Sequence, residues 1–389
     1  MTATQEAATD LIDAAKALVP QIEAYGDQSE RDRTMPKELV RAIAEAGLFR
    51  IWVPKALGGY EANIETNLRV IEEIARADGA AGWNVMIAGT GGMFAAYMPE
   101  QAAREIFGDR FATVAGALAP KGRAVPVDGG FRVSGQWPLA SGCLHASWLA
   151  GGSFIFDGDG QTPRMGDLGI PDLKLFFAPK DECEILDTWY SAGLRGTGSH
   201  DFAVKDMFVP EDRAFSLMGK AHHDGTLYRA GILNVFSPPV AAVALGIARG
   251  ALDAFEELAG SKTPTFSFST LRDRTTVQAQ VAQAEALVRS ARAFLFEVAG
   301  SMWETMRAGD QLSEEQEALV RLSCTHTAAA CAEAVDIVYT LGGATSVYAT
   351  SKLERCFRDV HVVTQHIAVS YQWYERTGQY FLGMGLARF

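Results

Sequence analysis

Apolar residues recur at intervals of three and four through the first part of the chain, a spacing typical of amphipathic helices. Leu39 and Ile43 show this spacing, and similar segments follow at residues 64–78 and 80–97. Helices of this kind bury their apolar faces against one another. We therefore predict an N-terminal α-helical domain over residues 1–112.

Short β-rich runs replace the helical spacing after this point. Valine, phenylalanine and other strand-forming residues alternate with polar ones, and Gly, Pro and Asp separate the runs. The sequence VDGGFRVSG at residues 127–135 predicts a β-hairpin, because Asp-Gly-Gly lies between two alternating runs. Strands without helices between them favour an antiparallel barrel or sandwich. We place this middle domain at residues 113–218.

Long helical segments return in the last part of the chain. Short breaks join them, which predicts an up-and-down four-helix bundle over residues 219–389. The expected fold class is thus α+β and mostly α. The four segments are residues 229–260, 272–307, 313–341 and 349–386.

Composition and charge exclude several kinds of protein. The net charge is −12 and no block of Lys and Arg occurs, which argues against nucleic-acid binding. No continuous apolar run reaches the length of about 18 residues that a membrane-spanning helix needs. The N-terminus lacks the pattern of a secretory signal, so we expect a cytoplasmic protein. Five cysteines form no C-x-x-C pair, and we predict neither disulfides nor a metal site.

Two short loops between predicted strands have compositions that suit a ligand. GLRGTGSHD at residues 193–201 offers backbone N–H groups to an anion, although its glycines are more commonly explained by a tight loop between strands. WPLASGCLHASW at residues 137–148 allows a flat ligand to approach its small residues, and Ser141 adds a hydroxyl group. Its alternative interpretation is a strand end with core tryptophans.

The segment near the C-terminus contains two of the seven histidines, His361 and His366. On a straight helix, five residues separate two side chains by roughly 140°, which disfavours a shared metal. The two histidines are therefore expected to have different surroundings. A single histidine is more often a packing residue than a catalytic one, so spacing alone leaves both interpretations open.

Four stretches together resemble the acyl-CoA dehydrogenase superfamily along essentially the whole chain. They are PKELVRAIAEAGLFRIWVPKALGGYEA, VSGQWPLASGCLHASW, GLRGTGSHDFAVKDMFVP and LGGATSVYATSKLERCFRDVH. The resemblance implies an N-terminal helical domain, a middle antiparallel β-barrel and a C-terminal four-helix bundle. It also implies a homotetramer with flavin at the junction of domains and subunits.

The dehydrogenases of this superfamily remove a proton with a glutamate that this sequence lacks. Nine residues after Arg358, where that glutamate commonly stands, the chain has Ile367. The second position used by the family falls within residues 227–246, which contain no Asp or Glu. The C-terminal pattern instead resembles the two-component flavin-dependent monooxygenases, similar to the oxygenase components of 4-hydroxyphenylacetate and hydroxylated-steroid hydroxylases.

This resemblance implies an enzyme that receives reduced flavin, FADH2 or FMNH2, from a separate NAD(P)H:flavin reductase. Molecular oxygen is the co-substrate, and a flavin C4a-hydroperoxide hydroxylates an aromatic or heteroaromatic small molecule such as a phenol or indole. Two alternatives stay open: an acyl-CoA dehydrogenase with a displaced base, and a catalytically silent flavin-binding subunit.

The resemblance also implies roles for individual residues. Ser141 maps onto the serine near flavin N5, and His366, or else His361, maps onto a catalytic histidine that accepts a proton from the substrate. The expected substrate walls are Trp83, Met93, Phe94, Phe236 and Trp373. The expected cofactor contacts are Trp137, Ala140, Ser141, Gly142, Arg195, Thr197, Ser199, Arg272, Gln278, Gly342, Gly343 and Arg358.

Overall fold

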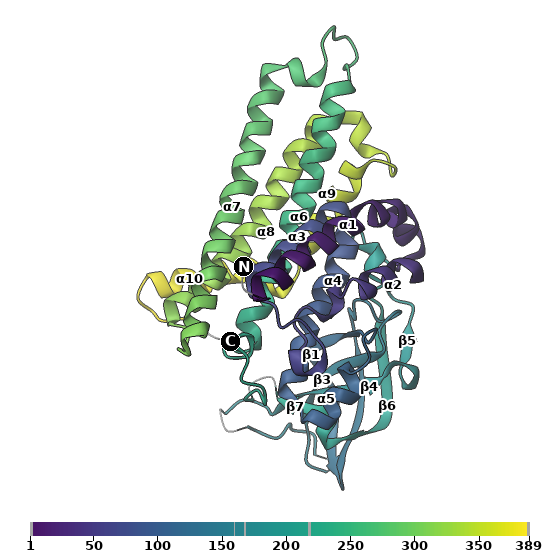
Figure 1. The fold of residues 1–389 in the computed structure, drawn as a ribbon, viewed down its shortest axis with the longest axis vertical. Coiled ribbons are helices and arrows are strands. Elements are labelled where there is room, and N and C mark those ends of the chain that lie inside the picture. The colour runs from purple at the N-terminus through teal and green to yellow at the C-terminus, as the bar shows by residue number, and fades with distance from the viewer. Residues whose placement is uncertain (1–2, 159, 167–168, 217–218, 387–389) are drawn as a thin grey trace.

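The computed structural model describes residues 3–158, 160–166, 169–216 and 219–386, and its first part is helical (Figure 1). Two of these helices begin at side-chain caps: Asn63 and Asp78 accept hydrogen bonds from the backbone N–H groups of Thr66 and Ala81 (2.7 and 2.9 Å). The caps fix where the third and fourth helices start. The helices are α1 (Ala3–Asp32), α2 (Lys37–Glu45), α3 (Ile64–Ala77), α4 (Gly79–Gly91) and α5 (Glu100–Phe107).

One sheet follows, with the strand order β5-β6-β2-β1-β3-β4-β7. The predicted hairpin is confirmed, since Val127 pairs with Gly130 across the turn. A second apolar core, which contains Trp137, belongs to this sheet. The strands are β1 (Val114–Val127), β2 (Gly130–Trp137), β3 (Trp148–Ile155), β4 (Leu173–Pro179), β5 (Glu184–Leu186), β6 (Asp201–Pro210) and β7 (Ala214–Ser216).

The expectation that all strand pairs are antiparallel is wrong for β1 and β3, which run parallel. The reason lies in the order of the chain. Strand β2 is antiparallel to β1 and therefore runs toward the side of the sheet on which β1 starts. After the connection of residues 138–147, β3 begins there, with Trp148 beside Val114, and runs in the direction of β1. This connection carries Ser141.

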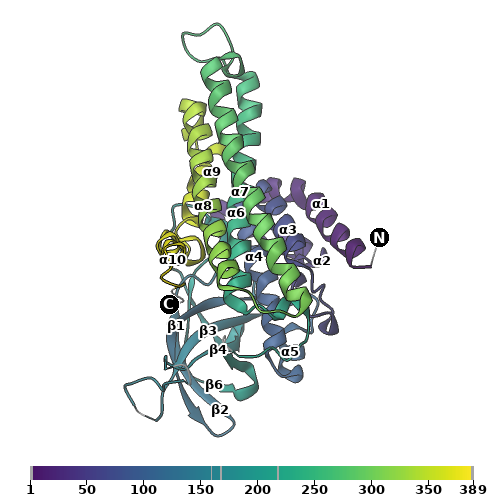
Figure 2. The ribbon, with the colours of Figure 1, turned by 90° about the vertical axis from the view of Figure 1, so that its left-hand side faces the viewer.

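The last part of the chain forms the helical bundle, in which α6 and α7 extend farthest from the sheet (Figure 2). The predicted single helix over residues 349–386 is wrong, because the chain leaves helical geometry after Thr364. His366 then caps the short 3-10 helix η10 (Ile367–Val369). The helices are α6 (Ile232–Ser261), α7 (Thr275–Ala308), α8 (Glu314–Gly342), α9 (Lys352–Val363) and α10 (Gln372–Phe381).

Helix α6 is the central helix of this bundle. It packs on α3, α8 and α9, and one apolar core joins the N-terminal helices to the bundle. Among the described residues, its segment Asn234–Ser261 is sufficiently long and apolar to span a membrane, which the search for a continuous apolar run missed. Inside this protein, however, 89% of its most apolar window is buried, as expected for the core helix of a bundle.

Candidate active site

A chain of buried hydroxyl groups joins the two loops that the sequence singled out. The Oγ atoms of Ser141 and Ser199 are 2.7 Å apart, and Thr197 Oγ1 lies 2.6 Å from Ser199 Oγ. Thr197 donates in turn to the carbonyl of Leu194 (2.8 Å). Each hydroxyl group in this series has a hydrogen-bond partner. The series as a whole therefore fixes the direction of the Ser141 hydroxyl.

Trp83 connects this hydroxyl chain to the C-terminal segment. Its indole Nε1–H donates to Ser141 Oγ (2.9 Å), and its ring meets the His366 ring edge-on, with centroids 5.4 Å apart. The N-terminal helix α4, the middle-domain connection and the C-terminal segment thus each contribute one side chain. Three of the predicted site residues, from three separate regions, lie in contact.

The hydrogen bond of His366 defines which ring nitrogen carries the proton. Nδ1 accepts from the backbone N–H of Ala368 (3.2 Å), and burial lowers the pKa of the imidazole to about 4. The ring is therefore neutral at physiological pH and carries its proton on Nε2. In this tautomer Nε2 can donate a hydrogen bond.

His361 has the different surroundings expected from its spacing. Its Nε2 lies 2.9 Å from Asp336 Oδ1, and its ring packs edge-on against Phe357. The side chain is 42% exposed, and its partner comes from α8. Of the two histidines, only His366 contacts Trp83 among the described contacts.

Asn84 and His145 belong to the same region, and the sequence analysis missed both. Asn84 is 1% exposed and donates from Nδ2 to the carbonyl of Gly196 (3.3 Å). Among the described residues, neither Asn84 Oδ1 nor His145 Nδ1 has a hydrogen-bond partner. Burial lowers the pKa of His145 to about 4, so its ring is neutral. Asn84 is the one uncharged polar side chain in the run GAAGWNVMIAG, a signal that could have drawn attention to it.

Gly142 keeps the space between these two side chains open. Its φ of +81° favours glycine, and a Cβ there would lie 3.1 Å from His145 Nε2 and 3.3 Å from Asn84 Oδ1. Buried polar atoms without partners normally receive them from a ligand or water. The donor and acceptor groups along the pyrimidine edge of a flavin suit this set, with Ser141 beside them, so the residues fit the flavin that the resemblance implies.

Of the other expected substrate walls, Phe94 and Phe236 contact each other. Phe94, from the 3-10 helix η3 (Gly92–Tyr97), stacks on Phe236 with ring centroids 5.6 Å apart. Met93 is completely buried. Trp373 on α10 donates from Nε1 to the carbonyl of Ile367 (2.6 Å), directly after His366.

Three predicted cofactor contacts have structural surroundings instead. Trp137 is 1% exposed, stacks on Phe202 and donates to the carbonyl of Gly152, so the sheet core covers its indole. Ala140 is fully buried in the same core. Arg358 pairs with Glu30 (2.8 Å) and donates to the carbonyl of Ala192 (2.7 Å).

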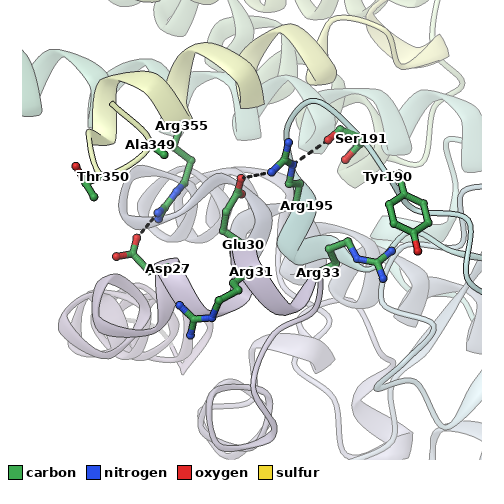
Figure 3. A pocket seen from close by; sticks show the side chains of 10 residues that line it. All are labelled: Asp27, Glu30, Arg31, Arg33, Tyr190, Ser191, Arg195, Ala349, Thr350 and Arg355. Atoms are coloured by element: carbon green, nitrogen blue, oxygen red, sulfur yellow. Dashed lines mark hydrogen bonds and ion pairs between the residues drawn. The ribbon is translucent and has the colours of Figure 1, made fainter. Parts of the chain in front are cut away.

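Arg195 lines a separate cavity of about 520 Å³ between α1, the loop after β5 and the start of α9 (Figure 3). It pairs there with Glu30 (3.5 Å) and donates to the carbonyl of Ser191 (2.9 Å). On the same loop, the Ser199 hydroxyl contacts Ser141, and the Thr197 hydroxyl contacts Ser199.

The remaining predicted cofactor contacts lie at the opposite end of the bundle. Gln278 donates to the carbonyl of Arg272 at the start of α7 (2.9 Å). Lys262, at the end of α6, donates to the carbonyl of Gly342 (2.6 Å), which precedes Gly343. This end of the bundle points away from the sheet (Figure 2). Within one chain, these residues do not meet Ser141.

Comparison with known proteins decides the family. Residues 3–107 match the acyl-CoA dehydrogenase N-terminal domain, and residues 239–371 match the acyl-CoA dehydrogenase C-terminal domain. An indole-3-acetate monooxygenase of Pseudomonas putida is 37% identical over 91% of this chain and 89% of its own length. The chain belongs to the flavin-dependent monooxygenases of the acyl-CoA dehydrogenase family. Reduced flavin is therefore the cofactor of this monooxygenase, and molecular oxygen is its co-substrate.

Other relatives of this flavin-dependent monooxygenase agree. An indole-3-acetate monooxygenase of Acinetobacter baumannii is 30% identical over 94% of this chain and 91% of its own length. The flavin-dependent monooxygenase oxygenase subunit HsaA of Mycobacterium tuberculosis is 29% identical, covering 95% and 94%. Its crystal structure superposes with a TM-score of 0.90, at 27% identity and 98% coverage of both chains. XiaF from Streptomyces sp., in complex with FADH2 and glycerol, gives 0.89 at 25% identity, covering 98% of this chain and 96% of its own.

Proposed function

We propose that this monooxygenase is the oxygenase component of a two-component system and hydroxylates a phenol, an indole or a related aromatic small molecule. A separate NAD(P)H:flavin reductase would supply the reduced flavin. The observation that carries the proposal is the contact of Ser141, Trp83 and the neutral His366. Two relatives are named after an indole acid, which makes indole-3-acetate the first compound to assay.

The residues of this chain would have separate roles in binding the flavin and excluding water. Reduced flavin, when bound, supplies the means to activate oxygen. Ser141 presents a hydroxyl held by Trp83 and Ser199, and Asn84 Oδ1, which has no partner among the described residues, would accept a hydrogen bond from the flavin ring edge. The buried aromatic cluster around Phe94 excludes water from the region.

His366 would hold the substrate through Nε2–H. Because Nδ1 accepts from Ala368, Nε2 carries the proton, and the hydroxyl oxygen of a phenol could accept a hydrogen bond from it. The proton-accepting role expected from the sequence requires a different tautomer, in which Nδ1 carries the proton. That tautomer gives up the hydrogen bond from the N–H of Ala368.

We further propose a cytoplasmic homotetramer. The contacts expected at Arg272, Gln278, Gly342 and Gly343 lie too far from Ser141 to serve the same flavin in one chain. A second copy of the chain can bring its bundle end to this site, so that each flavin is held by two subunits.

Reconstitution tests this function. Product should form from indole-3-acetate or a phenol only when protein, reductase, NADH, flavin and oxygen are all present. His366→Ala should lower the rate of product formation roughly 100-fold and increase released hydrogen peroxide, because an oriented hydrogen-bonding group is lost. The matched control is His361→Ala, which should behave as wild type. Reduction of bound flavin by an acyl-CoA, without reductase, would contradict the proposal.

A further inference from the structure

We propose that Asp359 is a positioning residue for Ser141: through the backbone of Leu194, it fixes the direction in which the Ser141 hydroxyl group points. The inference rests on the proposed function, since it concerns the hydroxyl group that would contact the flavin. Asp359 acts through the hydroxyl chain of Ser141, Ser199 and Thr197, which ends at the carbonyl of Leu194.

The carbonyl of Leu194 sets the direction of every proton in the hydroxyl chain. A carbonyl can only accept, so Thr197 donates its single hydroxyl proton to it (2.8 Å). Thr197 Oγ1 must then accept from Ser199 (2.6 Å), and Ser199 Oγ must accept from Ser141 (2.7 Å). One lone pair of the Ser141 oxygen accepts from the Trp83 indole (2.9 Å). The proton of Ser141 is thus directed to Ser199, and its second lone pair is left for a ligand.

Leu194 has a backbone conformation that needs support from its surroundings. Its φ of 50° and ψ of 33° lie in the left-handed region, which residues with a Cβ atom adopt at a cost in free energy. In this conformation its N–H donates to Asp359 Oδ1 (2.6 Å), while its carbonyl accepts from Thr197. Asp359 and Leu194 are each 2% exposed. Without the carboxyl oxygen, a buried N–H would lack its partner, and a different conformation of Leu194 would become favourable.

Close backbone contacts hold Asp359 in place. A Cβ on Gly193 would lie 2.5 Å from the carbonyl that precedes Asp359, so the loop before Leu194 packs directly on the backbone of α9. A Cβ on Gly79 would lie 2.9 Å from Asp359 Oδ2, which places the carboxyl group at the start of α4, one turn before Trp83. Among the described hydrogen bonds and ion pairs, the one that Asp359 makes is with the Leu194 N–H. The carboxyl group therefore acts as an acceptor, and an amide oxygen can take its place.

The indole N–H of Trp83 reports on the Ser141 hydroxyl in protein without flavin. When tryptophan is labelled with nitrogen-15, each of the seven tryptophans gives one indole cross-peak in two-dimensional NMR, and Trp83→Phe identifies the peak of Trp83. We expect Asp359→Ala to move this cross-peak upfield, because a Ser141 oxygen that can turn is a weaker acceptor. Asp359→Asn keeps the acceptor oxygen and should leave the cross-peak at its wild-type position.

Thr197→Val and Thr327→Val form a matched pair. Thr197→Val interrupts the hydroxyl chain and should also move the Trp83 cross-peak upfield. Thr327 is buried as well, and its hydroxyl donates to the carbonyl of Ala291, between α8 and α7 (3.3 Å). Thr327→Val loses a comparable hydrogen bond outside the hydroxyl chain and should leave the cross-peak unmoved.

The reconstituted system adds a second readout, the share of reduced flavin that yields hydroxylated product. Asp359→Ala and Thr197→Val should raise the ratio of released peroxide to product roughly 2- to 10-fold, the range expected for one lost hydrogen bond. The KM for indole-3-acetate should change little, because the substrate contacts are intact. Asp359→Asn should recover the wild-type ratio.

The outcomes separate the positioning role from the proposed function. An unmoved Trp83 cross-peak in Asp359→Ala, or the same displacement in Asp359→Asn, would overturn the positioning role alone. Equal displacement in Thr197→Val and Thr327→Val would do the same. No hydroxylation of any indole or phenol would overturn the proposed function, and the cross-peak would still decide the positioning role. If Asp359→Ala does not fold, Asp359→Glu replaces it: its carboxyl group is displaced by one methylene group, and an unmoved cross-peak contradicts the role.

Discussion

Ser141 is the residue on which three parts of the candidate site converge. Its hydroxyl accepts the Trp83 indole N–H and contacts Ser199. Trp83 is only 6% exposed, so Ser141→Ala leaves a buried N–H without an acceptor. We expect a loss of about 1–3 kcal/mol in the free energy of unfolding, measured by urea denaturation, together with more released peroxide per product. Ser147→Ala, an exposed serine in the same connection, should stay within about 0.5 kcal/mol of wild type. Equal stability of both variants would argue against this role.

Single residues also show where inference from sequence stops. Ser141 and His366 could be assigned because their motifs are recognisable in the chain, and the structure places them on either side of Trp83. Asn84 and His145 could not, because their importance comes from missing hydrogen-bond partners, which only the folded chain reveals. Trp137 lies in a segment whose composition suits a ligand, but the sheet core covers its side chain. The local sequence does not reveal this burial.

Among the elements, α9 is tied to the middle domain through a buried carboxyl group. Asp359 is 2% exposed, and its Oδ1 accepts from the backbone N–H of Leu194 (2.6 Å). Burial is the main cause that raises the pKa of Asp359 to about 8, and the negative charge of the nearby Asp78 is the second. The unfolded pKa is about 4, so the native state binds one more proton between these values. The resulting stability is complete below about pH 4 and is lost as the pH rises through 8.

Asp359→Asn tests this linkage, because asparagine keeps the acceptor oxygen but cannot ionise. The Tm of wild type should fall between about pH 6 and pH 9, and the Tm of Asp359→Asn should fall less over that range. Asp128→Asn is the control, since Asp128 is exposed in the turn after β1. A pH dependence of Tm that is the same in Asp359→Asn as in wild type would show that Asp359 is ionised in the native state at neutral pH.

The elements differ in how far the sequence predicts them. Periodic apolar positions were sufficient for the long helices α6, α7 and α8, because each buries a continuous stripe. The end of α9 was missed, since the break depends on the His366 side chain accepting from the Ala368 N–H. The parallel pairing of β1 and β3 was missed as well, because it follows from where β2 ends in space.

At the scale of the whole molecule, the expected cofactor contacts divide into two groups at opposite ends of one chain. The sequence contains no information on the distances between elements. All the expected contacts were therefore assigned to one flavin site. The structure brings Ser141, Thr197 and Ser199 together but leaves Arg272 and Gln278 at the far end of the bundle. The proposed site shared between copies would reconcile the two groups, and it would make assembly a condition of activity.

The connection between α6 and α7 offers the test of this assembly. Phe266 and Phe268 on this connection have exposures of 102% and 108%, and the connection stands at the end of the bundle (Figure 2). Two fully exposed phenylalanines, two positions apart, are typical of a surface that another molecule covers. We expect the double variant Phe266→Ser and Phe268→Ser to shift the protein from a tetramer to smaller species in light scattering after gel filtration, and to weaken flavin binding. Phe111→Ser, at a 40% exposed position next to the sheet, should leave the tetramer intact. A wild-type monomer that binds reduced flavin and hydroxylates its substrate would contradict the shared site.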